Sequence, residues 1–166
     1  MKLLHRSKLS KKKIFEISNF HMKNIKGEFN LFGTEFFINF YETLSKNRES
    51  FFFLLEKNKK IEGFLIYTLS PVSFSKFYLK QNIFFFILFF FKSFKNPQVF
   101  FKFIKFLLFG YFLNKLKKKK NHPELLSIAI SNKFRDKGFG NILINKFKKK
   151  LYFKNKKFSL VIFKNT

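Results

Sequence analysis

The spacing of apolar residues predicts a helix followed by a β-hairpin between residues 34 and 71. The stretch "TEFFINFYETLSK" begins with a helix-capping Thr34 and repeats apolar residues at the i, i+3, i+4 spacing of a helix with one buried face. The next stretch, "SFFFLLEKNKKIEGFLIYTLS", has two apolar runs around a polar turn at 58–60, which is typical of a hairpin that Pro71 ends. The apolar residues of the helix are Phe36, Phe37, Phe40, Tyr41 and Leu44.

The first thirty residues carry weaker patterns. Residues 1–12 are rich in Lys and Ser, so we expect a disordered basic N-terminus. The stretch "KIFEISNF" (13–20) alternates apolar and polar positions and predicts a first strand, and "HMKNIKGEFNLFG" predicts a short helix and a loop closed by Gly33. The length of 166 residues fits one domain, which we place at 13–166.

The segment between Ser73 and Leu113 is dominated by Phe and broken by Lys92, Lys95 and Pro97. A membrane-spanning helix needs about 20 nearly uninterrupted apolar residues, and neither apolar run of this segment meets that length. We therefore expect two helices with aromatic faces. They either cover the core, with Lys stems lying along apolar surface, or rest on a membrane surface.

Strand and helix patterns alternate in the last third of the chain. The stretch "LLSIAI" predicts a strand, "SNKFRDKGFG" a loop, "NILINKFKKKLYF" a helix and "KKFSLVIF" a final strand. Leu143, Phe147 and Leu151 have the i, i+4, i+8 spacing of one helical face. This order is that of a βαβ unit, whose two strands lie parallel.

Composition shows a strongly basic chain, with 35 Lys and Arg against nine Asp and Glu, a net charge of +26 and 32 Phe. Such a chain is attracted to anionic membranes and nucleic acids. Only Arg6, Arg48 and Arg135 are arginines, although Arg is the usual partner of guanine and phosphate, and no nucleic-acid recognition motif is present. We expect no specific nucleic-acid partner.

Cysteine is absent, which excludes disulfides, thiol nucleophiles and thiolate metal sites. The three histidines have no metal-ligand spacing, and we expect no metal. No apolar run of the signal-peptide type follows the basic N-terminus, so a cytoplasmic location is expected, peripheral to the membrane if the aromatic helices touch lipid.

The loop before the last predicted helix holds Arg135, Gly138 and Gly140 within six residues. The N-terminus of a helix offers unpaired N–H groups and the positive end of the helix dipole, which together bind anions. Glycines remove the side chains that would keep a phosphate away. The alternative is an ordinary turn whose glycines allow tight packing.

The flanking strand and helix distinguish this loop from an ordinary turn. Between "ELLSIAIS" and "NILINKF", the loop resembles the acetyl-coenzyme A (acetyl-CoA) signature of the GNAT superfamily of N-acetyltransferases, Q/R-x-x-G-x-G/A, between the fourth strand and third helix of that fold. The stretch "KIEGFLIY" is similar to a common strand of the family, and the resemblance covers most of 13–163. It implies an α/β (α+β) fold with a mixed, mostly antiparallel sheet flanked by helices, and a Phe-rich helical insertion at about 73–121 before the fourth strand.

The resemblance also implies how acetyl-CoA is held. Backbone amides of the loop would bind the pyrophosphate, Lys133, Arg135 and Lys137 would add charge, and the strand would pair with the pantetheine arm. A primary amine of a small molecule, amino sugar or peptide would attack the thioester directly. The implied cofactor-binding residues are Ile128, Ala129, Ile130, Phe134, Arg135, Asp136, Lys137, Gly138, Phe139, Gly140 and Asn165.

The resemblance places a general base at Glu124, at the start of the strand before the loop. An alternative is that Glu124 only caps a strand in a basic neighbourhood. Asp136 lies inside the loop and is expected to satisfy the turn rather than to react.

The final helix and strands of the family, with a Tyr that protonates the leaving thiolate, have no counterpart after Asn165. A shortened gene, a chain completed by a partner in a homo-oligomer, and an inactive coenzyme-binding relic are the three explanations left open. A second function also stays open, that of a non-enzymatic basic, aromatic-rich protein on anionic membrane or nucleic acid.

Overall fold

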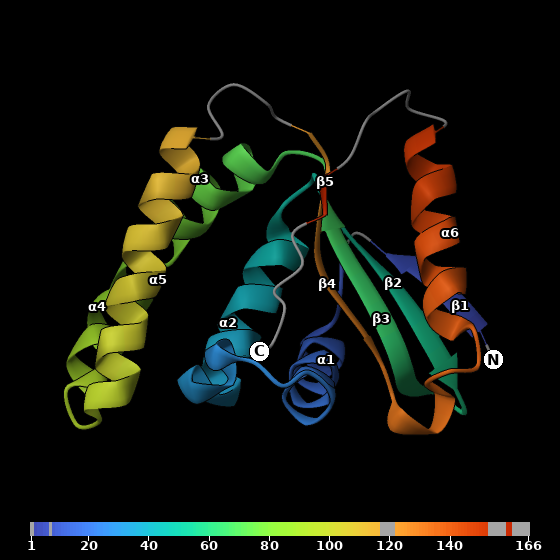
Figure 1. The fold of residues 1–166 in the computed structure, drawn as a ribbon, viewed down its shortest axis with the longest axis horizontal. Coiled ribbons are helices and arrows are strands. Elements are labelled where there is room, and N and C mark those ends of the chain that lie inside the picture. Colours follow the sequence, from blue (N-terminus) through green and yellow to red (C-terminus); the bar gives the residue numbers. More distant parts are fainter. Residues whose placement is uncertain (1, 7, 117–121, 153–158, 161–166) are drawn as a thin grey trace.

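The structure, a computed structural model, describes residues 2–6, 8–116, 122–152 and 159–160. A sheet with the strand order β1-β2-β3-β4-β5 runs through its centre (Figure 1). The pairs β1–β2, β2–β3 and β3–β4 are antiparallel, and β5 is parallel to β4. This mixed, mostly antiparallel sheet flanked by helices confirms the predicted fold class. The strands are β1 (Lys2–Arg6), β2 (Ser50–Lys57), β3 (Lys60–Thr68), β4 (Glu124–Ile130) and β5 (Ser159–Leu160).

Helices cover both faces of the sheet. One face packs against α1 and α2 and the other against α6, while α3, α4 and α5 stack beyond α2 at the far end from α6 (Figure 1). The helices are α1 (Lys11–Asn24), α2 (Gly33–Lys46), α3 (Pro71–Gln81), α4 (Ile83–Ser93), α5 (Pro97–Leu116) and α6 (Phe139–Tyr152), with 3₁₀ turns η1 (Glu28–Phe32) and η3 (Asn132–Phe134).

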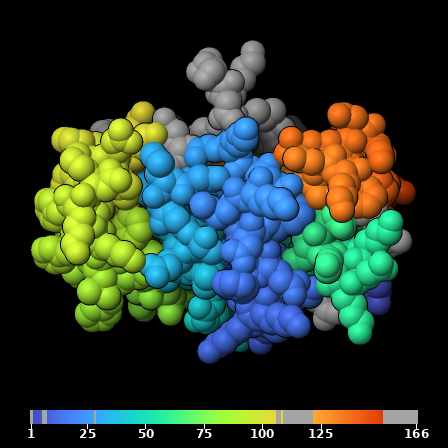
Figure 2. All heavy atoms as spheres, turned by 90° about the horizontal axis from the view of Figure 1, so that it is seen from below, coloured from blue at the N-terminus to red at the C-terminus, as the bar shows by residue number. Residues whose placement is uncertain are grey.

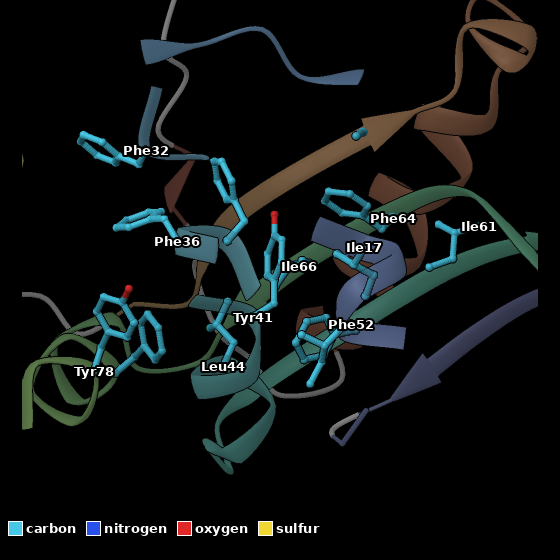
Figure 3. Close-up of a cluster of buried hydrophobic side chains, with 14 of the residues drawn as sticks. Ile17, Phe32, Phe36, Tyr41, Leu44, Phe52, Ile61, Phe64, Ile66 and Tyr78 are labelled. Carbon is cyan, nitrogen blue, oxygen red and sulfur yellow. The ribbon is translucent and has the colours of Figure 1, made fainter. Parts of the chain in front are cut away.

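The core has one layer on each side of the sheet. Tyr41 and Leu44 of α2 pack on Phe52 and Phe64 of the hairpin in the larger layer, which Figure 3 shows. The smaller layer lies under α6, where the predicted stripe is fully buried. Because both faces are covered, β2 and β3 read as continuous apolar runs rather than as alternating ones. The α6 stripe is Leu143, Phe147 and Leu151.

The structure confirms most of the predicted elements. The helix predicted from Thr34 is α2, and the predicted hairpin is β2–β3, turning at Asn58 and Lys59, which both have positive φ as a two-residue hairpin turn requires. The predicted strand, loop and helix of the last third are β4, the following loop and α6. In the predicted final strand, the described residues 159–160 pair parallel to β4, as expected for a βαβ unit.

The N-terminal predictions were wrong. Residues 2–6 are not disordered but form β1, which pairs along its whole length with β2, so the domain includes them. Residues 13–20 lie in α1 rather than in a strand. The side chain of Ser10 accepts a hydrogen bond from the N–H of Lys13 and caps this helix. Its buried residues, Ile14, Ile17, Ser18 and His21, follow the helical period.

The Phe-rich segment forms three helices rather than the predicted two. Pro71 does not only end the hairpin but occupies the first turn of α3, a position that tolerates its missing N–H. A break at Asn82 separates α3 from α4, where the Asn82 side chain donates hydrogen bonds to Thr43 Oγ1 and to the Tyr78 carbonyl. Among the described residues, no helix alone has the length and apolar character to cross a bilayer; α3 and α4 together reach both, with a 70° bend between them.

Candidate functional site

The loop between β4 and α6 begins at a fixed point. The backbone N–H of Ser131 donates to the Glu62 carbonyl at 2.9 Å, and its hydroxyl donates to Glu62 Oε2 at 2.7 Å. These two bonds tie the end of β4 to β3 before the chain turns through η3. The loop lies at the lower edge of the sheet in Figure 1, beside the end of α1.

Gly138 begins α6 in a conformation that favours glycine. Its φ is +76°, and its carbonyl accepts the N–H of Ile142 at 3.1 Å, the first bond of the helix. Asp136 also has a positive φ of 60°, which Asp tolerates better than most residues. Asp136 is therefore compatible with its position in the turn.

The turn leaves a run of backbone N–H groups without a protein partner. The N–H groups of Phe134 and Arg135 are bonded to the carbonyls of Ser131 and Asn132, and helix bonding starts at Ile142. Between them, the N–H groups of residues 136–141 have no acceptor within the described part of the chain. We call these six groups the amide cluster. An anion placed there would meet both free donors and the positive end of the α6 dipole.

The approach to the amide cluster is open. A Cβ built at Gly140 meets no heavy atom within 4 Å, and Gly138 is likewise unobstructed. The two glycines therefore leave space above the amides instead of serving close packing. This observation favours the anion-site interpretation over that of a tightly packed turn.

Cations surround the loop. The side chains of Lys133, Arg135 and Lys137 are exposed. An Arg135 guanidinium nitrogen donates to the carbonyl of Asn24, the last residue of α1, at 2.8 Å. A cation is favoured at that helix end, so Arg135 fastens the loop to α1 in addition to adding charge.

The Phe134 ring makes three further contacts at the loop. Its ring packs edge-to-face on Phe139 with 5.3 Å between the ring centroids. The ammonium groups of Lys57 and Lys137 lie 5.6 and 5.9 Å from the centre of the Phe134 ring, within the range of cation–π attraction. These contacts hold two positive charges at the loop.

A β-bulge interrupts β4 before it reaches the loop. Ile66 of β3 pairs with Ser127 and Tyr67 pairs with Leu125, so Leu126 has no partner on β3. Bulges bend a strand and redirect its groups. The described residues of β5 pair only with Glu124 and Leu125, so within the described chain the other edge of β4 has no strand partner from residue 126 to residue 130.

The structure brings two sets of predicted residues together. Ile128, Ala129 and Ile130 form the last part of β4 and lead directly into the loop with the amide cluster. Asn165 lies outside the described residues. Groups of three or more His, Asp or Glu that could hold a metal ion are absent from the described part of the chain.

Glu124 is buried at the opposite end of β4, with 9% of its surface exposed, across from Thr68 of β3. At the rise of a β-strand, the six steps from Glu124 to Ile130 span about 20 Å. Glu124 is therefore too far away to contact an anion at the loop. It can only act on a group carried back along the strand.

The sequence patterns did not predict a buried hydrogen-bonded group of side chains next to the bulge. Tyr41 Oη is hydrogen-bonded to His21 Nδ1 and to the side chain of Ser127. Burial lowers the pKa of His21 to about 4 and raises the pKa of Tyr41, so both groups are uncharged at neutral pH. The one signal in the sequence was the position of His21, one turn after Ile17 on the buried face of α1.

Comparison with known proteins adds one resemblance. No family model matches the sequence, and no curated protein matches it significantly. Among solved structures, the chain is similar to the ribosomal-protein-alanine N-acetyltransferase from Brucella melitensis biovar Abortus 2308, with 13% identity and a TM-score of 0.48. The match covers 99% of this chain and 79% of the other.

Proposed function

We propose that this chain is a GNAT-type N-acetyltransferase that moves an acetyl group from acetyl-CoA to a primary amine. The observation that carries the proposal is the amide cluster at a helix start cleared by Gly138 and Gly140, directly beyond the end of β4, whose described pairing with β5 stops at Leu125. A carrier with a pyrophosphate at one end and an extended amide-bearing arm fits both features at once. The position of Arg135, Gly138 and Gly140 in the loop between β4 and α6 supports this binding mode.

The pyrophosphate would accept hydrogen bonds from the amide cluster and would be attracted by Lys133 and Lys137. The pantetheine amides would pair with the backbone of Ile128 to Ile130 as an added strand. The acetyl thioester would then lie near the bulge at Leu126, on the way to Glu124. A backbone N–H of this edge would polarise the thioester carbonyl.

The reaction needs no covalent enzyme intermediate. The neutral amine attacks the thioester carbon, a C–N bond forms, and the C–S bond breaks to release the thiolate of coenzyme A. The amine loses one proton, for which we propose Glu124 as the acceptor, and the thiolate takes up a proton from solvent. Holding both reactants together supplies much of the rate enhancement. The acceptor is an amine of a small molecule, an amino sugar or a peptide.

Binding is tested by calorimetric titration of the full chain with coenzyme A and, separately, with pantetheine, which lacks the pyrophosphate. The proposal predicts that coenzyme A binds at least about tenfold more tightly. Equal affinities would show that the loop makes no use of the phosphates.

Transfer is tested by the release of free thiol from acetyl-CoA in the presence of amino sugars, small amines and peptides. The chain contains no cysteine, so a thiol reagent reports only the product. Thiol release that depends on one class of amine supports the proposal and identifies the acceptor. Binding of coenzyme A without transfer to any amine would support the inactive relic instead.

A further inference from the structure

The outward side of α4 is apolar although it faces solvent. Ile83, Phe84, Ile87, Leu88 and Phe91 have exposed fractions between 47% and 79%. Their spacing, i, i+1, i+4, i+5, i+8, places them on one side of the helix. We call this side the α4 outer face. Figure 2 shows the α4–α5 region at the end of the molecule away from α6.

The α4 outer face is not needed to attach the helix to the domain. The other side of α4 already does this, because Phe86 is buried and Phe89 packs on Phe32 and Phe103 with ring centroids 5.6 and 4.8 Å apart. The core beneath α4 is therefore complete without the outer residues. The outer residues therefore form an apolar surface that the packing of the domain does not use.

This surface is large. With about 200 Å² for a full side chain, the exposed fractions of these five residues leave on the order of 600 Å² of apolar area, at the upper end of the range for the largest patch on a typical monomer. Phe94 and Phe101, exposed by 55% and 70%, extend it past the end of α4 and onto α5. A patch of this size marks a docking surface.

The charges around the patch identify its partner. No Asp or Glu occurs from Gly63 to Pro123, whereas α3 and α5 each carry two or more lysines and α4 carries Lys92 in its last turn. Lys92 is paired with Glu35 of α2 at 2.9 Å. The exposed lysines of this region are Lys76, Lys80, Lys92, Lys95 and Lys105.

We propose that the α4 outer face and its lysines dock this protein on an anionic lipid bilayer, with α4 lying in the plane of the interface. Aliphatic and aromatic side chains enter the boundary between headgroups and acyl chains, and the lysines bind acidic headgroups. A second copy of the chain fits less well, since it would bring like charges together around the patch. Base stacking uses aromatic rings, and Ile83, Ile87 and Leu88 have none.

The docked orientation leaves the β4–α6 loop free. Figures 1 and 2 both place α4 and α6 at opposite ends of the molecule. Docking is therefore independent of the proposed acetyl transfer, and failure of either proposal leaves the other standing.

A single introduced tryptophan tests insertion, because the chain contains none. Phe84→Trp changes the most exposed residue of the face, and Phe15→Trp on α1, exposed by 54%, is the matched control. With vesicles containing phosphatidylserine, the emission of Phe84→Trp is expected to shift to the blue and to be quenched by brominated acyl chains. The Phe15→Trp emission is expected to stay unchanged. Absence of both effects at Phe84→Trp would overturn the proposal.

Vesicle co-sedimentation tests what drives the binding. Phe84→Asn with Leu88→Asn is expected to lower the bound fraction at least fivefold on phosphatidylserine vesicles, whereas Phe15→Asn with Leu31→Asn keeps it. If the Phe84–Leu88 variant binds vesicles as well as wild type does, and every chain loses vesicle binding completely in high salt, charge attraction alone drives the binding. That result would overturn the proposed insertion. Self-association that disappears in the same variant, without any vesicle binding, would identify a second copy as the occupant and overturn the lipid proposal.

Discussion

Substitutions at Gly140 are expected to change the stability of the fold and the affinity for coenzyme A independently of each other. The residue lies in the first turn of α6, and a Cβ there meets nothing within 4 Å. Gly140→Ala therefore introduces no clash. Replacing Gly by Ala in a helix interior stabilises the fold by about 0.5–1 kcal/mol, and the first turn favours the lower end of this range. We expect Gly140→Ala to raise the free energy of unfolding by about 0.5 kcal/mol.

The affinity for coenzyme A, in contrast, is expected to depend on the size of the side chain at residue 140. The signature itself allows Ala at this position, so Gly140→Ala is expected to keep the affinity for coenzyme A within about threefold, or 0.7 kcal/mol. Gly140→Trp places a large ring over the amide cluster. It is expected to weaken coenzyme A binding more than tenfold, which is at least about 1.4 kcal/mol.

Calorimetric titration with coenzyme A measures the affinities, and urea unfolding verifies that each variant is folded. Gly27→Trp is the control, because Gly27 is exposed and also has open space around it, outside the β4–α6 loop. Coenzyme A binding by folded Gly140→Trp at the wild-type affinity would refute the placement of the pyrophosphate. An equal loss in Gly27→Trp would attribute the effect to the added ring rather than to its position.

Glu124→Gln is expected to lower turnover at least tenfold with coenzyme A affinity kept, and unchanged turnover in the thiol assay would remove Glu124 from the mechanism. Because the folded-state pKa of His21 is lowered to about 4, only the unfolded chain binds that proton between pH 6.5 and 4, and stability falls across this window. Urea unfolding of wild type is therefore expected to lose up to about 3 kcal/mol more than His21→Gln between these pH values, and parallel losses would contradict the lowered pKa. Gly63→Ala would put its Cβ 2.6 Å from Ile130 Cδ1, the movable end of a half-buried side chain, and 3.2 Å from the Ala129 carbonyl oxygen, so a loss of about 1 kcal/mol in unfolding free energy is expected, and wild-type stability would contradict this packing.

The elements that could be predicted from the sequence are those whose signals are local. The apolar stripe of α2 and the two apolar runs of the hairpin each repeat over enough residues to fix their type. The β4–α6 loop could be predicted because its backbone favours glycine at two positions. Gly138 has a positive φ, and Gly140 leaves the approach to the amides open.

The N-terminus could not be predicted because its structure depends on distant partners. β1 is held by β2, where Leu4 pairs with Leu54, and nothing in the local composition reveals that pairing. In α1, two polar residues lie on the buried face and hide the helical stripe. Ser18 is satisfied by the carbonyl of Ile14 and His21 by Tyr41, so their burial is compatible with the core.

Long-range hydrogen bonds also decided features that the sequence could not indicate. The break between α3 and α4 lies at Asn82 because its side chain bonds Asn39 and Thr43 of α2. The contact of Arg135 with the end of α1 joins residues 111 positions apart. Each depends on the folded arrangement rather than on neighbouring residues in the chain.

Backbone amide NMR during titration with coenzyme A tests whether the amide cluster and the end of β4 bind the coenzyme, since it reports each N–H group separately. We expect saturable chemical-shift changes of the amide resonances of residues 136–141, together with those of Ile128, Ala129 and Ile130. Pantetheine should shift the strand amides and leave the amide cluster unchanged. Saturable binding that bypasses the cluster, or no binding of coenzyme A at all, would contradict the account.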